Sequence, residues 1–192
     1  LSHYNLISAC GADPGLPDDA RIWGVARVVN HGSRPGLPGP MPAGIVRATI
    51  GLTARAPLMQ VIGLCRFSYP AIGGFQVEHG SVEERMEYLY QPARMEERLR
   101  LFETVCLPGL KAQSEADFTF VIVTGDSLPA AYRNRLEALT AGMPQARIVA
   151  RPPGKMRDVM KQVFRGARRD PAEPVLQFRH DDDDAVSVDF VE

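Results

Sequence analysis

The sequence predicts an α/β fold in which a parallel β-sheet carries helices on both faces. Four short apolar runs rich in β-forming residues alternate with three stretches of helical pattern. The run at 118–124 is almost continuously apolar, as expected of a strand buried on both faces of a parallel sheet. With 192 residues, 45% of them hydrophobic, the chain can form one domain with a substantial core.

The first predicted unit is a strand, a loop and a helix. Residues 59–67 form a compact apolar run, and the stretch 68–76 that follows reads as a loop. Ser81 with Glu84 three residues later matches a capping box and predicts a helix start. Pro92 suits the first turn of a second helical piece.

A distortion or an end is predicted within that second helical piece. Pro108 and Gly109 should kink or end it, since proline removes a backbone donor. Before them, four apolar residues recur at helical spacing on one face. They are Met95, Leu99, Phe102 and Cys106.

The remaining predicted elements follow in alternation. A strand at 118–125 precedes a helix at 129–142, with Pro129 in its first turn, Gly142 as its C-cap, and Tyr132, Leu136 and Leu139 turned inward. A strand at 146–150, an amphipathic helix at 154–170 and a strand at 174–178 complete the pattern. The apolar stripe of the amphipathic helix comprises Met156, Val159, Met160, Val163 and Ala167.

Residues 1–58 differ in composition from 59–192. The first segment has no Lys and no Glu and is dense in Gly, Pro, Ala and Arg, so we expect it to be mostly disordered or a non-native N-terminal extension read from upstream sequence. The second segment carries the regular pattern and is the predicted folded domain. A natural disordered tail is the alternative for the first segment.

Composition also excludes some classes of binding partner and indicates a cellular compartment. A formal net charge of -1 gives no electrostatic footprint for nucleic acid or an anionic membrane. No apolar run is long enough to span a bilayer, and no secretory signal is visible. The three cysteines are sparse and lack metal or redox spacing, which indicates reduced thiols and a cytoplasmic setting.

The predicted topology brings four loops together. Ligands of parallel sheets bind outside the carboxyl ends of the strands. In this sequence that edge collects the loops at 66–70, 124–127, 151–155 and 179–184.

The last of these loops contains four consecutive aspartates, Asp181–Asp184. Adjacent carboxylates repel one another, and a hard divalent cation such as Mg²⁺ or Mn²⁺ would offset that repulsion. Side chains alternate along an extended segment, so Asp181 and Asp183 are candidate metal ligands facing one way, while Asp182 and Asp184 form the other set. A solvated charged loop is the alternative. His180 is either a ligand or, more simply, a hydrogen-bonded structural residue.

The other loops carry candidates for binding a nucleotide diphosphate. Arg66 ends the first strand and can bind phosphate bidentately. Asp126 can accept hydrogen bonds from a base or a ribose, and Lys155 and Arg157 lie near the positive end of a helix dipole. Each has a plainer alternative as a surface salt bridge, a turn residue or a solvent-exposed charge.

From 59 to 192 the chain resembles the bacterial rhamnosyltransferase family, whose members look like GT-A-type glycosyltransferases. The stretches that carry the resemblance are GLCRFSYP, RLFETVCLPGLKAQSEADFTFVIVTGDSLP and LQFRHDDDDAV. The resemblance implies a GT-A-like (Rossmann-like) fold. It also implies that Asp181 and Asp183 match the D-x-D pattern, with Asp184 close by, and hold a divalent metal against the diphosphate of a nucleotide sugar.

By this resemblance the expected activity is metal-dependent transfer of a sugar from a nucleotide-diphosphate donor to the hydroxyl of a saccharide or glycolipid acceptor. The family resemblance places acceptor-binding residues and a general base beyond Glu192, so we expect the domain to be incomplete at its C-terminus and assign no catalytic residue. A nucleotidyltransferase and a truncated, non-catalytic nucleotide-binding fragment are the alternatives.

Overall fold

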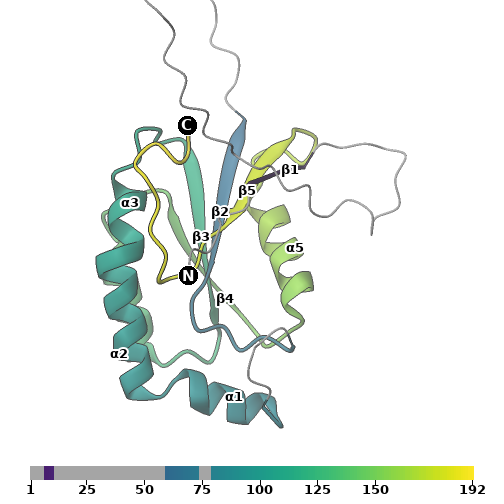
Figure 1. Cartoon of the computed structure of the whole chain (residues 1–192). Helices are drawn as coiled ribbons and strands as arrows, with labels where there is room; N and C mark the ends of the chain where they lie inside the picture. The colour runs from purple at the N-terminus through teal and green to yellow at the C-terminus, as the bar shows by residue number, and fades with distance from the viewer. Residues whose placement is uncertain (1–6, 11–58, 74–78) are drawn as a thin grey trace, which may run out of the picture.

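The computed structural model describes residues 7–10, 59–73 and 79–192. Its elements form one five-stranded sheet in the order β1-β5-β2-β3-β4, with helices on both sides (Figure 1). The strands are β1 (Ile7–Cys10), β2 (Gln60–Arg66), β3 (Phe118–Gly125), β4 (Ala146–Arg151) and β5 (Val175–Arg179). The helices are α1 (Val82–Leu89), α2 (Pro92–Leu101), the π-helical turn η1 (Phe102–Cys106), α3 (Leu107–Lys111), α4 (Ala130–Thr140) and α5 (Met156–Ala167).

The four strands predicted from the sequence are present and parallel. Strand β2 lies in the middle and pairs with β3 on one side and β5 on the other, and β4 pairs with β3. All eight residues of β3 are buried, as its continuous apolar run predicts. The predicted α/β class with a parallel Rossmann-like sheet is therefore confirmed.

The edge strand β1 was not predicted. It pairs antiparallel with β5, with Ile7 opposite Phe178 and Cys10 opposite Val175. It belongs to the segment 1–58, of which residues 1–6 and 11–58 lie outside the described residues. The expectation of a mostly disordered or non-native extension thus remains a prediction.

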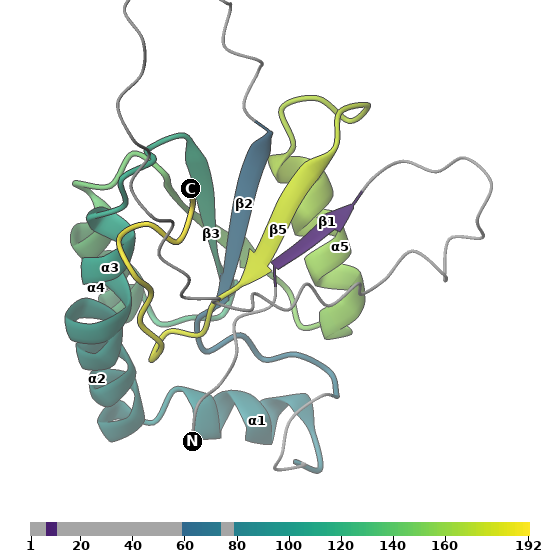
Figure 2. The same ribbon diagram turned by 45° about the horizontal axis from the view of Figure 1, so that its top comes forward.

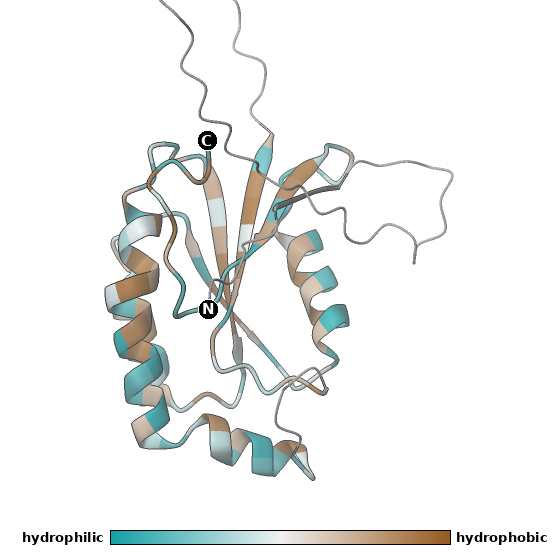
Figure 3. Ribbon diagram, in the orientation of Figure 1, coloured by the Kyte–Doolittle hydropathy of each residue, from teal (hydrophilic) through white to brown (hydrophobic). Residues whose placement is uncertain are grey.

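Helices cover both faces of the sheet, as the alternating pattern predicts (Figures 1 and 2). On one face α2, η1, α3 and α4 bury Leu99, Phe102 and Leu136 against β3. On the other face α5 packs its hydrophobic side on the sheet and turns its polar side to solvent (Figure 3). The predicted stripe of α5 is confirmed, and Phe164 joins it as a fourth buried position beside Val159, Met160 and Val163.

The predicted start of α1 is confirmed. The Ser81 hydroxyl accepts a hydrogen bond from the Glu84 backbone N–H at 3.1 Å. The Glu84 carboxylate in turn accepts from the backbone N–H of Gly80 at 2.9 Å. The first contact satisfies a backbone donor that a helix N-terminus otherwise leaves unpaired, and the second ties the residue before the N-cap to the first turn of the helix.

Pro108 and Gly109 were predicted to kink or end the helix, and of these two outcomes the end is wrong. The helix that begins at Pro92 passes through the π-helical turn η1 and continues as α3 to Lys111. In the π turn the Leu107 N–H donates to the carbonyl of Phe102, and Pro108 then occupies the first turn of α3, where proline is tolerated. Because the hydrogen bonds change register in the π turn, the helix continues even though proline has no N–H to donate.

The C-terminus of α4 also differs from the prediction. Ala141, rather than Gly142, is the C-cap, and it has an ordinary right-handed helical conformation. Gly142 does not adopt the positive φ that favours glycine after a helix. The inward positions Tyr132, Leu136 and Leu139 are confirmed as part of the core.

After β5 the chain turns back toward the amino ends of the strands along α2 and α3 (Figures 1 and 2). The Gln113 amide donates to the carbonyl of Ser187 at 2.6 Å, and the Ser114 N–H donates to the carbonyl of Val188 at 2.7 Å. Val191 is buried in the same core as α2. Within the described part of the chain, no helix combines the length and apolarity needed to cross a membrane.

Candidate functional site

The carboxyl ends of β2, β3, β4 and β5 meet at one edge of the sheet, as predicted. The order β5-β2-β3-β4 places the aspartate run, Arg66, Asp126 and Arg151 one after another along that edge. Three backbone hydrogen bonds, each 3.0 Å, extend the pairing just past the strand ends. They join His180 N to Leu64 O, Phe67 N to Val123 O, and Asp126 N to Arg151 O.

The aspartate run alternates between solvent and core. Asp181 and Asp183 are exposed, Asp184 is half-buried, and Asp182 is fully buried at 0%. A backbone hydrogen bond from Asp184 N to Asp181 O, 3.2 Å long, closes a turn around the run. The predicted alternation is thus present in the exposure of the four side chains.

The buried member of the run is held by an arginine from α2. The Arg98 Nε donates to Asp182 Oδ2 at 2.7 Å, and its Nη2 contacts Asp182 Oδ1. The other terminal nitrogen of Arg98, Nη1, donates to Asp183 Oδ2 at 3.1 Å. Sequence reasoning missed Arg98 entirely, because nothing in the pattern of α2 distinguishes it from the other arginines of that helix.

Arg66 lies beside the aspartate run. It ends β2, the strand next to β5, and its guanidinium is partly buried. Burial lowers the pKa of Arg66, and the negative charge of Asp181 is the strongest influence in the opposite direction. The structure thus brings together two of the predicted site residues, one basic and one acidic, from neighbouring strands.

A second arginine of α2 binds the loop after β2. The Arg94 Nη1 donates to the Ser68 hydroxyl and to the carbonyl of Leu89, both at 3.1 Å. Ser68 has a φ of 46°, in the left-handed region that non-glycine residues rarely occupy. Burial lowers the pKa of Arg94, and the charge of Arg98 acts in the same direction.

Asp126 begins the loop after β3 and is exposed. Its negative charge is among the influences that raise the pKa of Tyr69 and Tyr90, after burial as the main cause. Asp126 therefore lies close to both phenols. The Tyr90 hydroxyl pairs with the Ser127 hydroxyl at 3.1 Å, which ties the end of α1 to this loop.

Lys155 and Arg157 lie at the start of α5, and both are exposed. Their loop is joined to the loop after β2 by a hydrogen bond from Ile72 N to Gly154 O, 2.9 Å long. The two basic residues follow β4, however, while the aspartates follow β5, so two strands separate these groups. The structure brings Lys155 and Arg157 to the correct edge of the sheet but not beside the aspartate run.

His180 immediately precedes the aspartates and is buried at 1%. Neither ring nitrogen forms a hydrogen bond with the described residues, in contrast to the hydrogen-bonded structural role considered above. Its ring packs edge-on against Phe120 with centroids 6.1 Å apart. Burial lowers the pKa of His180. The negative charge of Asp184 and its nearby backbone oppose this lowering of the pKa, although the backbone geometry falls short of a hydrogen bond.

The aspartate run offers oxygen donors for a divalent metal ion. Among the described residues, no three His, Cys, Asp or Glu side chains are grouped so that they could hold an ion by themselves. Asp181 and Asp183 do present exposed carboxylate oxygens, the donors that Mg²⁺ and Mn²⁺ prefer. Mg²⁺ sites commonly use one or two carboxylates together with substrate phosphates, so this donor set fits a site that a phosphate ligand completes.

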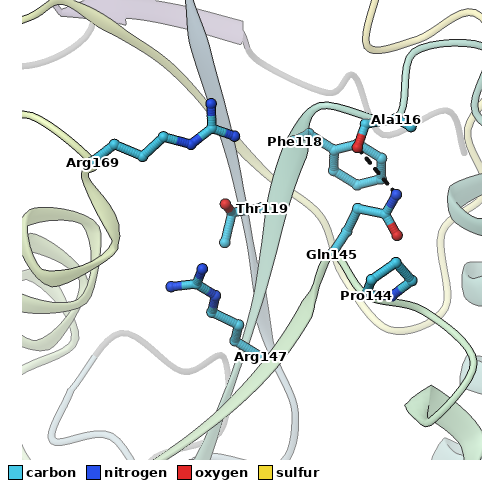
Figure 4. Close-up of a pocket in the computed structure, with 7 residues that line it drawn as sticks. All are labelled: Ala116, Phe118, Thr119, Pro144, Gln145, Arg147 and Arg169. Carbon is cyan, nitrogen blue, oxygen red and sulfur yellow. Dashed lines mark hydrogen bonds between the residues drawn. The ribbon is translucent and has the colours of Figure 1, made fainter.

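A separate cavity of about 200 Å³ opens at the opposite edge of the sheet, near the amino end of β3 (Figure 4). Arg147 and Arg169 flank it on one side, and Gln145 and Phe118 on the other. Arg169 is already paired with Asp117. Ligands of parallel sheets bind at the carboxyl edge, so this hollow does not belong to the candidate site.

Comparison with known proteins shows the family to which the chain belongs. A family model described as "Putative rhamnosyl transferase" matches residues 60–192, which is more than half of the chain. No match was found among the curated proteins or among the solved structures. The matched region contains β2 to β5 and all the residues of the candidate site.

Proposed function

The chain belongs to the rhamnosyl transferase family whose model it matches, and from this premise we propose that it takes part in metal-dependent transfer of a deoxyhexose such as rhamnose. The donor is a nucleotide-diphosphate sugar, and the acceptor is the hydroxyl of a saccharide or glycolipid in the cytoplasm. One observation supports this most directly. The exposed carboxylates of Asp181 and Asp183 lie at the carboxyl end of β5, beside Arg66 at the end of β2.

In this proposal Asp181 and Asp183 would hold Mn²⁺ or Mg²⁺, with Asp184 half-buried beside them. When bound, the ion supplies Lewis-acid stabilisation of the charge that develops on the diphosphate. Asp182 is excluded as a ligand, because both of its oxygens are already engaged by Arg98 in the interior.

Basic and polar residues along the same edge would bind the rest of the donor. Arg66 offers a planar guanidinium for phosphate oxygens. Lys155 and Arg157 add positive charge at the start of α5, where helix-terminal N–H groups also favour anions. Asp126, exposed after β3, would accept hydrogen bonds from the base or the ribose.

The proposed reaction exchanges one C–O bond for another. The bond between the anomeric carbon and the diphosphate oxygen breaks, and the acceptor oxygen forms the new glycosidic bond. The acceptor proton passes to a base, and the nucleoside diphosphate leaves with the bonding electron pair. None of the described residues is assigned as that base.

Calorimetric titration of the full chain with a panel of nucleoside diphosphates tests the proposal. Binding is expected in the presence of Mn²⁺ and is expected to be lost with a chelator. Asp181→Asn and Asp183→Asn should each weaken Mn²⁺-dependent binding by about tenfold or more, since each removes a negative charge beside the ion, and a hydrogen bond to a charged group, taken as the scale, contributes roughly 1.5–3 kcal/mol.

The matched control is Glu173→Gln, which removes an exposed carboxylate in the turn before β5, at the opposite end of that strand. It should bind like the unaltered protein. Nucleoside diphosphate binding that is equally tight with Mn²⁺ and with a chelator would contradict metal dependence. Absence of any binding would contradict the donor site, and release of pyrophosphate from a nucleoside triphosphate would support the nucleotidyltransferase alternative.

A further inference from the structure

Two arginines on one face of α2 hold the two loops that flank the candidate site. Arg94 and Arg98 are four residues apart, so their side chains lie one above the other on the helix. Arg94 reaches the loop after β2 through the Ser68 hydroxyl. Arg98 reaches the loop after β5 through Asp182 and Asp183.

The helix that carries these arginines is firmly anchored. Met95 and Leu99, each following one of the arginines in sequence, are 0% exposed, and Phe102 in the next turn is also fully buried. These residues pack on the sheet face that contains Phe120 and Ile122. The two guanidinium groups are therefore presented from a rigid element to two loops.

The contact between Arg98 and Asp182 fixes which aspartates face outward. Asp182 is fully buried, and a buried carboxylate is very costly unless it is paired. With both of its oxygens held by Arg98, the alternation along the run turns Asp181 and Asp183 to solvent. A shift of one residue would expose Asp182 and bury its neighbours.

We propose that Arg94 and Arg98 are positioning residues that set the geometry of the donor site from outside it. Arg98 selects Asp181 and Asp183 as the outward carboxylates. Arg94 holds Ser68 in its left-handed conformation and so fixes the loop that follows Arg66. The pair together sets the position of the aspartate run relative to the loop after β2.

The first test needs no ligand and therefore does not depend on the proposed function. Backbone hydrogen exchange is followed by mass spectrometry in the double variant Arg98→Met with Asp182→Leu. Because this variant removes both members of a buried ion pair, it should fold with a melting temperature close to that of the unaltered protein. Hydrogen exchange over 180–186 should nevertheless accelerate at least about tenfold, since the turn loses the hydrogen bonds that Arg98 donates to Asp182 and Asp183.

Arg94→Met should accelerate exchange over 67–71 and leave 180–186 unchanged. Arg100→Gln is the matched control on the same helix, because Arg100 pairs with Glu97 at the exposed surface and touches neither loop. Native exchange rates over 180–186 in the double variant would overturn the role of Arg98. Acceleration spread evenly over the whole chain would also overturn it, since that result indicates general destabilisation.

The second test rests on the proposed function. Residues that orient metal ligands typically contribute about 10- to 100-fold to metal affinity. The folded double variant should therefore lose Mn²⁺-dependent nucleoside diphosphate affinity by that factor. The single variant Arg98→Lys, which keeps Asp182 and a positive charge beside it, should lose less of this affinity. If the unaltered protein binds no nucleoside diphosphate, the proposed function fails while the exchange result still decides the positioning role. If the double variant binds normally, the positioning role fails alone.

Discussion

Gly109 of α3 lies directly against the main-chain carbonyl of Val186, which follows the aspartate run. A Cβ at position 109 would overlap that oxygen and lie 3.2 Å from Val186 Cγ2. The chain that returns from the candidate site is thus packed on the helix at a point where only glycine leaves room. Because the obstacle is backbone, a rotamer change cannot relieve it.

Gly109→Ala is therefore expected to destabilise the protein, although alanine is the better helix former by about 1 kcal/mol. Overpacking of this kind typically costs about 1–3 kcal/mol. Urea unfolding followed by circular dichroism measures the change. Gly166→Ala in α5 is the control, because a Cβ there meets nothing within 4 Å and should stabilise the protein. Equal gains in both variants would contradict the close approach.

The strands were predictable because their signal is local. A run such as 118–125 is continuously apolar since both of its faces are covered, and that property is visible without knowledge of the partners. The capping box at Ser81 is equally local. The π turn before Pro108 was not predictable, because a proline after a helical run normally kinks or ends the helix and the sequence carries no signal for the register shift. The strand β1 has no sustained period of its own.

The site was only half predictable for a related reason. Alternation along the aspartate run follows from backbone geometry, and the exposure of Asp181 and Asp183 agrees with it. Which member is buried depends on Arg98, which lies 84 positions away from Asp182 in sequence. The contact of Arg94 with Ser68 is likewise a tertiary relationship between α2 and another loop. Contacts of this kind are decided by packing.

The thiols of Cys65 and Cys106 are expected to be unreactive in the folded protein. Both are 0% exposed, and burial raises the pKa of each well above its usual range. With Cys10 replaced by serine, Ellman's reagent at pH 8 should label no thiol before denaturant is added and two thiols afterwards. Rapid labelling of either thiol in the folded protein would contradict their burial.

The same thiols predict a fall in stability at alkaline pH. In the unfolded chain they ionise near pH 9.0, while burial keeps them protonated in the folded state. A raised folded pKa contributes stability below the unfolded pKa and loses it as the pH rises above 9. The free energy of unfolding should therefore fall between pH 9 and 10, by at most about 1.4 kcal/mol per thiol and pH unit.

Above pH 10, two tyrosines add to this fall in stability. Burial also raises the pKa values of Tyr69 and Tyr90 from 10.0, so their ionisation acts in the same direction. A variant with Cys65→Ala and Cys106→Ala is the control. Its unfolding free energy should be flatter between pH 9 and 10. An unchanged slope would assign the effect to other groups.

Arg66→Gln is expected to separate metal binding from diphosphate binding. The guanidinium lies at the end of β2 close enough to Asp181 for the two charges to influence each other. Loss of the positive charge should weaken nucleoside diphosphate binding about tenfold, the size of one charge-assisted hydrogen bond. Affinity for Mn²⁺ alone should stay the same or increase, since Asp181 no longer has that cation beside it. Calorimetry with each ligand in turn measures both changes.

Diphosphate affinity is expected to fall while Mn²⁺ affinity does not, and this difference makes the prediction specific to the site. A variant that merely disturbed the fold would weaken both kinds of binding, whereas loss of one cation from a mixed site affects the anion and the metal differently. Arg165→Gln, in the last turn of α5 at the other end of that helix, removes a positive charge without touching this edge and should change neither affinity. Parallel weakening of Mn²⁺ and diphosphate binding by Arg66→Gln would show that Arg66 supports the loop rather than binding the donor. Higher salt should reduce the effect of the substitution on diphosphate affinity only slightly, because Arg66 is partly buried and partly buried charge pairs are screened less than exposed ones.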